Sequence, residues 1–183
     1  MALSSIWRFW ILSVLLAGTL SLGCERLRLQ YVLNTETLSK LNEMGGRMPL
    51  HCMTRRGALQ TQSLDLVTLS KNLNAEDKIL VIHQTLHQIN KTFSENRSST
   101  PWDSALIENF LLQLNQQLEE LRECQREPLS DSMNEEIQEY FGKLREFLEL
   151  ERFSDCAWKV VRSRTRTCLL QIPTIIAKIR KNN

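Results

Sequence analysis

Glycine and proline are scarce in this chain, which has six glycines and four prolines among its 183 residues. Runs in which apolar and polar residues alternate, as they do in half-buried strands, are scarce too. The scarcity of alternating runs argues against a fold that is rich in β-sheet. No glycine-rich loop of the kind that cradles phosphate is present, and the glycine pair at 45–46 is expected to form a turn.

A large excess of charge is also missing. The chain carries 23 Lys and Arg against 21 Asp and Glu, a formal net charge of +2. Without Arg8, which lies in a segment that we expect to be removed, 22 basic side chains remain against 21 acidic ones. A balance this close argues against a dedicated binder of polyanions. The basic run KIRK at 178–181 is expected to be the last turn of a helix, where the helix dipole favours cations.

Residues 1–23 are typical of a secretory signal peptide. Arg8 is the only charge, the run FWILSVLLAGTLSL is apolar, and the small residues Ser21 and Gly23 precede Cys24. The run is shorter than the ~20 residues that span a bilayer, which disfavours a membrane anchor. Ser21 fits a lipoprotein signal poorly. The sequence therefore predicts cleavage after Gly23 and a single mature domain over 24–183, because 160 residues are enough for one substantial core.

Helical periodicity dominates the rest of the chain. Four segments each place apolar residues at spacings of three and four, with Ile82, Phe110, Phe141 and Cys168 among them, one in each segment, and a weaker segment begins near Leu27. The predicted helices are 26–44, 75–93, 101–124, 133–150 and 155–180. The weak first helix is expected to bury Leu27, Tyr31, Leu38 and Leu41. A long connection, 45–74, separates the first two helices, and Pro173 is expected to kink or interrupt the last helix near Leu169.

Four boundaries carry start signals. We expect Asn74 to cap the second helix and Thr100, ahead of Pro101 and Asp103, to cap the third. The start of the fourth helix offers Ser132 and Glu135 as a capping box. The start of the fifth helix offers Ser154 as a cap, with Phe153 and Trp158 as a hydrophobic staple. Trp158 is expected to belong to the core.

The five cysteines, at 24, 52, 124, 156 and 168, all lie in the predicted mature chain. Secretion makes disulfides the default, and an odd count leaves one thiol over. Short connections make the last four helices alternate in direction. A first helix parallel to the second brings together Cys24 with Cys124 and Cys52 with Cys156, whereas an antiparallel one brings together Cys24 with Cys156 and Cys52 with Cys124. Cys168 lies about 18 Å along the helix from Cys156, so we expect a buried free thiol.

Three segments resemble one known family. CAWKVVR at 156–162 resembles the last helix of type I interferons, and SSTPWDSALIENFLLQLNQQLEELREC at 98–124 resembles their third helix. VIHQTLHQINKTF at 81–93 aligns without gaps with the second helix. The resemblance covers nearly the whole predicted mature chain. It implies an all-α fold, a five-helix up-up-down bundle of the helical cytokine type with a long first crossover. It also implies parallel first and second helices and the disulfides Cys24–Cys124 and Cys52–Cys156.

The resemblance further implies a secreted, antiviral and immunomodulatory cytokine of innate immunity. Such a cytokine bridges a two-chain type I interferon receptor at the cell surface and signals through Janus kinases and STAT proteins. The positions that match the tight-binding receptor chain's site are Met53, Arg56, Arg162 and Arg166. Arg56 and Arg162 keep the family residue type, whereas Met53, Arg166, Thr167 and Leu170 depart from it. From periodicity alone, Lys159, Arg162 and Arg166 are interpreted as a solvated basic face.

The weaker receptor chain, by the same resemblance, packs across the second, third and fourth helices. The positions that fall there are His83, Gln84, His87, Asn90, Lys91 and Gln138, of which only His83 keeps the family residue. Asn90 and Asn96 open glycosylation sequons, NKT and NRS. A glycan on Asn90 would sit at or beside this receptor face, so Asn96, which we expect in a loop, is the more suitable acceptor.

Chemistry of other kinds finds little support. His83 and His87 are four apart on one helix, but no acidic residue follows His83 as in a metalloprotease, and no third metal ligand is placed. His51 and Cys52 could form a nucleophile pair only with a free cysteine. Glu119, Glu120 and Glu123 are interpreted as a solvated face. We therefore expect no enzyme, cofactor, metal, small-molecule substrate or nucleic-acid partner, and no membrane insertion of the mature chain. The alternatives are another long-chain four-helix cytokine or hormone, or a secreted helical carrier of apolar ligands with a large internal cavity.

Overall fold

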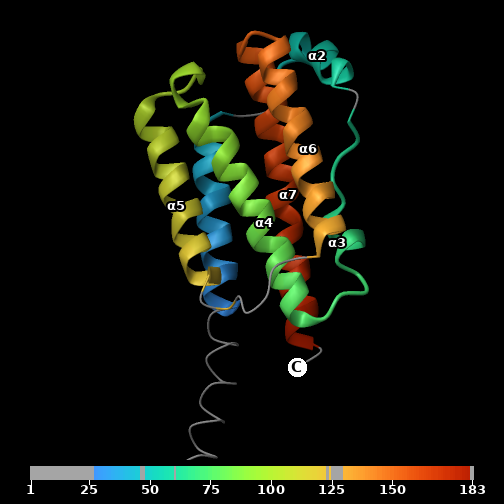
Figure 1. The fold of residues 1–183 in the computed structure, drawn as a ribbon. Coiled ribbons are helices and arrows are strands. Elements are labelled where there is room, and N and C mark those ends of the chain that lie inside the picture. Colours follow the sequence, from blue (N-terminus) through green and yellow to red (C-terminus); the bar gives the residue numbers. More distant parts are fainter. Residues whose placement is uncertain (1–26, 46–47, 60, 123, 125–129, 182–183) are drawn as a thin grey trace, which may run out of the picture.

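The fold was analysed in a computed structural model that describes residues 27–45, 48–59, 61–122, 124 and 130–181. The predicted signal peptide and Cys24 lie outside these residues. No strand occurs in the described part of the chain, and none of its helices is both long and apolar enough to cross a membrane. Figure 1 shows a bundle of long helices that run roughly along one axis.

Five long helices were predicted, and the structure has each of them within a few residues of its predicted bounds. They are a first helical segment at 27–43, α4 (Ala75–Glu95), α5 (Ser104–Arg122), α6 (Asp131–Leu150) and α7 (Asp155–Lys181). The long connection contains η1 (Leu50–Cys52), α2 (Met53–Ala58) and α3 (Leu66–Leu69), and η2 (Arg97–Ser99) lies between α4 and α5.

The first helical segment and α4 run in the same direction, and α5, α6 and α7 then alternate (Figure 1). The long connection returns the chain from one end of the bundle to the other and packs α3 against α7. This up-up-down arrangement is the one that the resemblance implied. It resolves the choice that helical periodicity left open.

The predicted apolar stripes of the last four helices form the core. Ile82, Phe110, Phe141 and Cys168, one residue from each stripe, are all fully buried. An aromatic group fills one end, where the ring centroids of Phe93 lie 5.1 Å from Phe110 and 5.5 Å from Trp158. Trp158 is fully buried and its Nε1 donates a hydrogen bond to the Ser99 carbonyl at 2.8 Å. The prediction that Trp158 belongs to the core is confirmed.

The buried face of the first helical segment differs from the predicted one. Leu27 and Leu41 are buried, but Tyr31 is 53% exposed, and the polar Gln30, Asn34 and Thr37 are buried in its place. Gln30 Nε2 donates to the Gln117 carbonyl at 2.9 Å, and Gln117 Nε2 donates to Thr37 Oγ1 at 2.6 Å. Hydrogen bonds to α5 and, from Asn34, to α7 thus satisfy the buried donors of this face. Because polar residues occupy the buried face, the apolar periodicity of this helix is weak.

Two predicted helix starts are confirmed. Asn74 Oδ1 accepts from the Asp77 amide at 2.8 Å, and Ser154 Oγ accepts from the Ala157 amide at 3.2 Å. The first turns of α4 and α7 therefore have side-chain acceptors for amides that lack a helical partner.

The other two predicted starts are wrong. Helix α5 begins at Ser104, because the Asp103 carboxylate accepts from the Ala105 amide at 2.8 Å and takes the capping role predicted for Thr100. Helix α6 begins at Asp131, since the Asn134 amide already donates to the Ser130 carbonyl. Ser132 therefore lies inside the helix and cannot be its cap.

Of the two outcomes predicted for Pro173, an interruption is wrong, because α7 continues to Lys181, and a kink stays a prediction. Proline has no amide hydrogen to donate to the carbonyl four residues earlier, which is that of Leu169. The buried Asn34 side chain supplies the missing donor, with Nδ2 3.0 Å from the Leu169 oxygen. The helix therefore passes through Pro173 without leaving this carbonyl unpaired.

Candidate functional site

A disulfide between Cys52 and Cys156 joins the long connection to the first turn of α7. The two Cα atoms lie 5.0 Å apart, although the residues are 104 positions apart in the chain. This bridge is the one that the resemblance implied for these two cysteines. It holds Met53, which is 50% exposed, at the start of α7. His51 lies close to both sulfurs, but sulfurs in a disulfide cannot act as thiolate ligands or nucleophiles.

Arg162 is buried rather than part of a solvated basic face, so the interpretation from periodicity is wrong for this residue. Only 7% of it is exposed, and its Nη1 donates to the carbonyls of Leu41, at 3.1 Å, and Gly45. Both carbonyls lie at the end of the first helical segment, where unpaired carbonyls and the helix dipole favour a cation. Burial and the charge of Arg166 lower the pKa of Arg162. Arg162 thus fixes the end of the first helix against α7.

Arg166 and Lys159 lie on either side of Arg162 along α7. Arg166 is exposed and its Nε donates to Asn42 Oδ1 at 3.2 Å, whereas Lys159 pairs with Asp155. Together they border a cavity of about 540 Å³, which we call the basic pocket. The residues lining it are Asn42, Gly45, Met48, Lys159, Arg162, Ser163 and Arg166. Sequence reasoning missed Asn42, Gly45 and Met48, because they lie in the first helix and the long connection, outside the three segments that carry the resemblance.

The structure describes only part of the site predicted for the tight-binding receptor chain. Met53 is the first residue of α2, which packs against α7, and the bridge joins the neighbouring Cys52 to Cys156, six positions before Arg162. Arg56 lies within α2, but the position of its side chain falls outside the described part of the structure. Beside it, Arg55 forms an ion pair with Glu151 at 3.0 Å, which attaches α2 to the end of α6.

Two further α7 side chains, which sequence reasoning did not single out, hold the long connection in place. Arg164 donates to Ser63 Oγ and, at 2.9 Å, to the Thr61 carbonyl. Gln171 Nε2 donates to the Leu64 carbonyl at 2.9 Å, and its Oε1 accepts from the Val67 amide at 3.2 Å. These backbone contacts give the connection a defined path along α7. A polar residue facing a loop has no periodic signal in the sequence.

The second predicted surface lies on α4, which packs against both α5 and α6. His87 and Lys91 are exposed and His83 and Gln84 are half-buried, while Gln138 is exposed on α6. The rings of His83 and His87 are stacked, with their centroids 6.4 Å apart and an angle of 13° between their planes. Burial, and then the charges of His87 and Arg122, lower the pKa of His83.

The two sequon asparagines lie toward the C-terminal end of α4, Asn90 inside the helix and Asn96 directly after it. Asn90 Nδ2 donates to Asn115 Oδ1 at 2.9 Å, so this side chain bridges α4 and α5. Asn96 directly follows α4, and its Nδ2 donates to the Thr92 carbonyl at 3.1 Å. The location of Asn96 after the end of the helix agrees with its expected place in a connection, and glycosylation of either residue stays a prediction.

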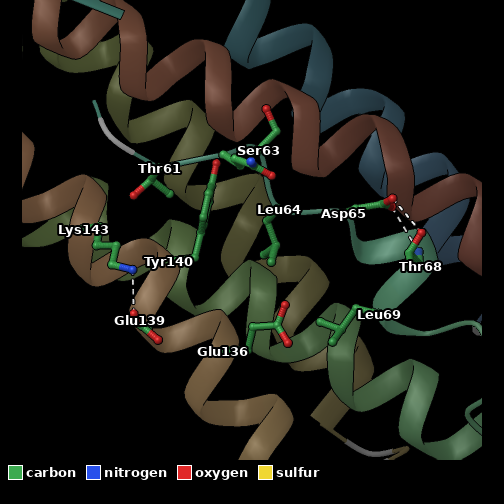
Figure 2. Close-up of a pocket in the computed structure, with 11 residues that line it drawn as sticks. Thr61, Ser63, Leu64, Asp65, Thr68, Leu69, Glu136, Glu139, Tyr140 and Lys143 are labelled. Atoms are coloured by element: carbon green, nitrogen blue, oxygen red, sulfur yellow. Dashed lines mark hydrogen bonds and ion pairs between the residues drawn. The ribbon is translucent and has the colours of Figure 1, made fainter. Parts of the chain in front are cut away.

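A second cavity, of about 500 Å³, lies between the long connection and α6 (Figure 2). Figure 2 shows the Tyr140 ring reaching from α6 toward Ser63 and Leu64, with Lys143 paired to Glu139 on the same helix. Asp65, Glu136 and Glu139 contribute carboxylates to its lining. A carrier of apolar ligands needs an apolar cavity inside the bundle. Neither of these two cavities is of that kind, because both are lined by charged residues and lie outside the core.

The remaining cysteines behave differently from one another. Cys168 is a fully buried free thiol, as predicted, and burial raises its pKa to about 12. Cys124 is half-buried just after α5 and forms no disulfide with a described residue. Its predicted partner, Cys24, lies outside the described residues, so the Cys24–Cys124 bridge stays a prediction.

The parallel first pair of helices, the long crossover and the alternating last three helices define a bundle of the helical cytokine class. A family model for the interferon alpha/beta domain matches residues 27–179. Interferon beta of Tachyglossus aculeatus aculeatus is 30% identical over 159 residues, which cover 83% of this chain and 84% of that protein. Interferon alpha-2 of Equus caballus is 28% identical over 158 residues, which cover 81% of this chain and 84% of that protein.

A solved structure shows the same fold. Zebrafish interferon 1 superposes with a TM-score of 0.72 and 25% identity, and the match covers 85% of this chain and 99% of that one. The chain belongs to the type I interferon family, and it is therefore a cytokine rather than an enzyme.

Proposed function

We propose that this cytokine is secreted and acts by bridging two receptor chains at the cell surface, which activates Janus kinases and STAT proteins. The observation that carries the proposal is the arrangement around the Cys52–Cys156 bridge. It fixes the exposed Met53 on the long connection close to α7, whose exposed Arg166 borders the basic pocket. An apolar anchor flanked by arginine is a composition common at the centres of binding interfaces.

We assign the tight-binding receptor chain to this surface. The disulfide and the contacts of Arg162, Arg164 and Gln171 hold the surface in one conformation before binding. Such preorganisation lowers the conformational entropy that is lost when a partner binds. In this proposal Met53 and Arg166 contact the receptor directly, whereas Arg162 acts by positioning the end of the first helix beneath them.

We assign the weaker receptor chain to α4, with His83, Gln84, His87 and Lys91, and to Gln138 on α6. These side chains lie on elements other than those that form the first surface, so both receptor chains can bind at once. Asn90 adjoins them and donates to Asn115. The proposal therefore favours Asn96 as the glycosylated residue and leaves Asn90 unmodified.

Two measurements test the proposal. Purified mature protein is applied to receptor-bearing cells and STAT phosphorylation is recorded, and binding to each isolated receptor ectodomain is measured. Met53→Asp and Arg166→Glu should weaken binding to one ectodomain only, each by roughly tenfold or more, which corresponds to about 1.4 kcal/mol. His87→Glu should weaken binding to the other ectodomain only.

Lys143→Glu is the matched control, since Lys143 is an exposed lysine on α6 that lies in neither surface. It should leave both affinities unchanged. Full STAT activation by Met53→Asp, together with unaltered binding to both ectodomains, would remove the first surface from the proposal.

A further inference from the structure

The near-neutral charge of the chain conceals a strong segregation of charge between two neighbouring helices. Helix α7 carries seven basic residues and one acidic residue, Asp155. The basic residues are Lys159, Arg162, Arg164, Arg166, Lys178, Arg180 and Lys181. Helix α6 carries six acidic residues and only two basic ones, Lys143 and Arg145. A surface formed by α7 can therefore attract anions although the total charge is small.

The basic pocket is the concave part of this helix. Of the seven described residues that line it, three are cationic and none is acidic. The cavity between the long connection and α6 is nearly the same size but has three carboxylates and one lysine in its lining. The two cavities thus differ in sign, and only the basic pocket suits an anion.

Arg162 and Arg166 are one helical turn apart on α7 and repel each other. The carbonyls of Leu41 and Gly45 hold the Arg162 guanidinium in place, so it cannot move away from Arg166. Burial, and after it the charge of Arg166, lower the pKa of Arg162. An anion bound between them would stabilise both charged forms.

We propose that the basic pocket binds a sulfate group of an extracellular sulfated polysaccharide. Guanidinium groups donate paired hydrogen bonds that match the oxygens of tetrahedral and planar oxyanions. The exposed Arg166 and the half-buried Lys159, which also pairs with Asp155, make the accessible contacts, and Arg162 supplies a fixed charge at the base of the pocket. Arg164 faces the long connection instead, where it donates to Ser63 and Thr61. Lys178, Arg180 and Lys181 lie about 18 Å or more farther along the helix than Arg166, a distance that a linear polymer of repeated anions can span.

A sulfated polysaccharide fits better than a nucleic acid for two reasons. The predicted secretory signal places the protein outside cells, where sulfated glycans are the abundant polyanions. The chain also lacks the large overall positive charge that steers proteins to nucleic acids over long distances.

The proposal is tested with purified mature protein on immobilised heparin, in the absence of any receptor. The sodium chloride concentration needed for elution, and the dissociation constant at several salt concentrations, are measured. The Lys159→Gln/Arg166→Gln double variant should bind about tenfold more weakly at physiological salt, and its affinity should depend less steeply on salt because fewer counterions are released.

The matched control is Lys91→Gln/Lys143→Gln. It removes the same net charge from two lysines that, like Lys159, pair with an acidic residue four positions away in a helix. The control should elute like the unmodified protein, and urea denaturation should show that both double variants remain folded. Equal weakening by the two double variants would show a general charge effect and overturn the assignment of the site.

Ligand comparison tests the chemistry of the anion. Desulfated heparin and hyaluronan, which keep carboxylates but lack sulfates, should bind much more weakly than heparin. An oligodeoxynucleotide of equal charge should also bind more weakly. Equal binding of any of these three ligands would overturn the assignment to sulfate.

Discussion

The side-chain amide of Asn34 donates a hydrogen bond to the Leu169 carbonyl, the group that Pro173 leaves without a helical donor. The two residues are 135 positions apart, and the bond is buried between the first helical segment and α7. It lets the longest helix of the bundle continue through a proline. It also explains why an asparagine is buried here, since its amide has an acceptor inside the protein.

Asn34→Ala should therefore lower the free energy of unfolding by about 1–3 kcal/mol, because it leaves a buried carbonyl without a donor. Pro173→Ala restores an amide that can donate to Leu169, so the same Asn34 substitution should cost less in that background. Urea denaturation of the two single variants and the double variant measures this coupling, expected to be at least about 0.5 kcal/mol. Strictly additive effects would show that the two residues do not act on the same carbonyl.

Arg162→Ala should destabilise the protein by about 1.5–3 kcal/mol, since it removes charge-assisted hydrogen bonds to two carbonyls at the end of the first helix. Arg166→Ala, one turn away and exposed, should change stability by less than about 0.5 kcal/mol. Chemical denaturation of both variants checks the contrast. Equal effects would contradict the distinct roles that the structure gives to the two arginines.

This contrast matters for receptor studies. A loss of receptor binding in Arg162→Ala does not by itself identify a contact, because the end of the first helix loses its anchor. Arg162→Lys, which keeps the charge but not the guanidinium geometry, should retain part of the stability. Its receptor affinity should fall less than that of Arg162→Ala.

Replacing both Cys52 and Cys156 by alanine should cost about 2–5 kcal/mol of stability, because the bridge closes a loop of more than a hundred residues. The same variant should bind the tight receptor chain more weakly than its remaining folded fraction explains, since Met53 would no longer be held beside α7. Thermal unfolding and ectodomain binding at a temperature where the variant is folded measure the two effects. Unchanged affinity of the folded variant would contradict the positioning role of the bridge.

The Cys168 thiol should resist alkylation in the native protein and react only after denaturation, because it is fully buried and its pKa is raised to about 12. In the unfolded chain the thiol has its ordinary pKa of 9.0, so as the pH rises it ionises in the unfolded chain before it ionises in the folded protein. Stability should therefore decline as the pH rises above about 9. Cys168→Ala should decline less between pH 8 and pH 10. Labelling by iodoacetamide followed by mass mapping, and urea denaturation at the two pH values, check both points.

Acidification should lower the free energy of unfolding through protonation of His83. Its pKa is lowered from the ordinary value of 6.5, chiefly by burial. The unfolded chain therefore takes up this proton first, so the contribution of His83 to stability is fully present above pH 6.5 and is lost as the pH falls below it. His83→Gln should show a smaller loss of stability between pH 7 and pH 5. A variant with the same loss as the unmodified protein would show that His83 is not responsible.

Much of the bundle could be predicted from the sequence, because a helix that packs on one face must repeat its apolar residues at spacings of three and four. The stripes of α4, α5, α6 and α7 follow this rule. Helix starts were predicted correctly where one side chain could reach an orphan amide, as at Asn74 and Ser154. They were wrong where several candidate caps lay within a few residues of one another, as at Thr100 and Asp103.

The first helix shows the limit of periodicity. Its buried face contains Gln30, Asn34 and Thr37, whose partners Gln117 and Leu169 lie far away in the chain. A polar residue that is satisfied by a distant carbonyl looks the same in the sequence as a solvated one. For the same reason Arg162 was interpreted as part of an exposed basic face.

The sequence by itself determined which segments are helical and which face of the last four helices is apolar, because both depend on residues close together in the chain. It left open the direction of the first helix, and with it the identity of the cysteines that meet. Only the tertiary structure decided that direction and the burial of Arg162, because both depend on which elements pack together across a connection long enough to allow either arrangement.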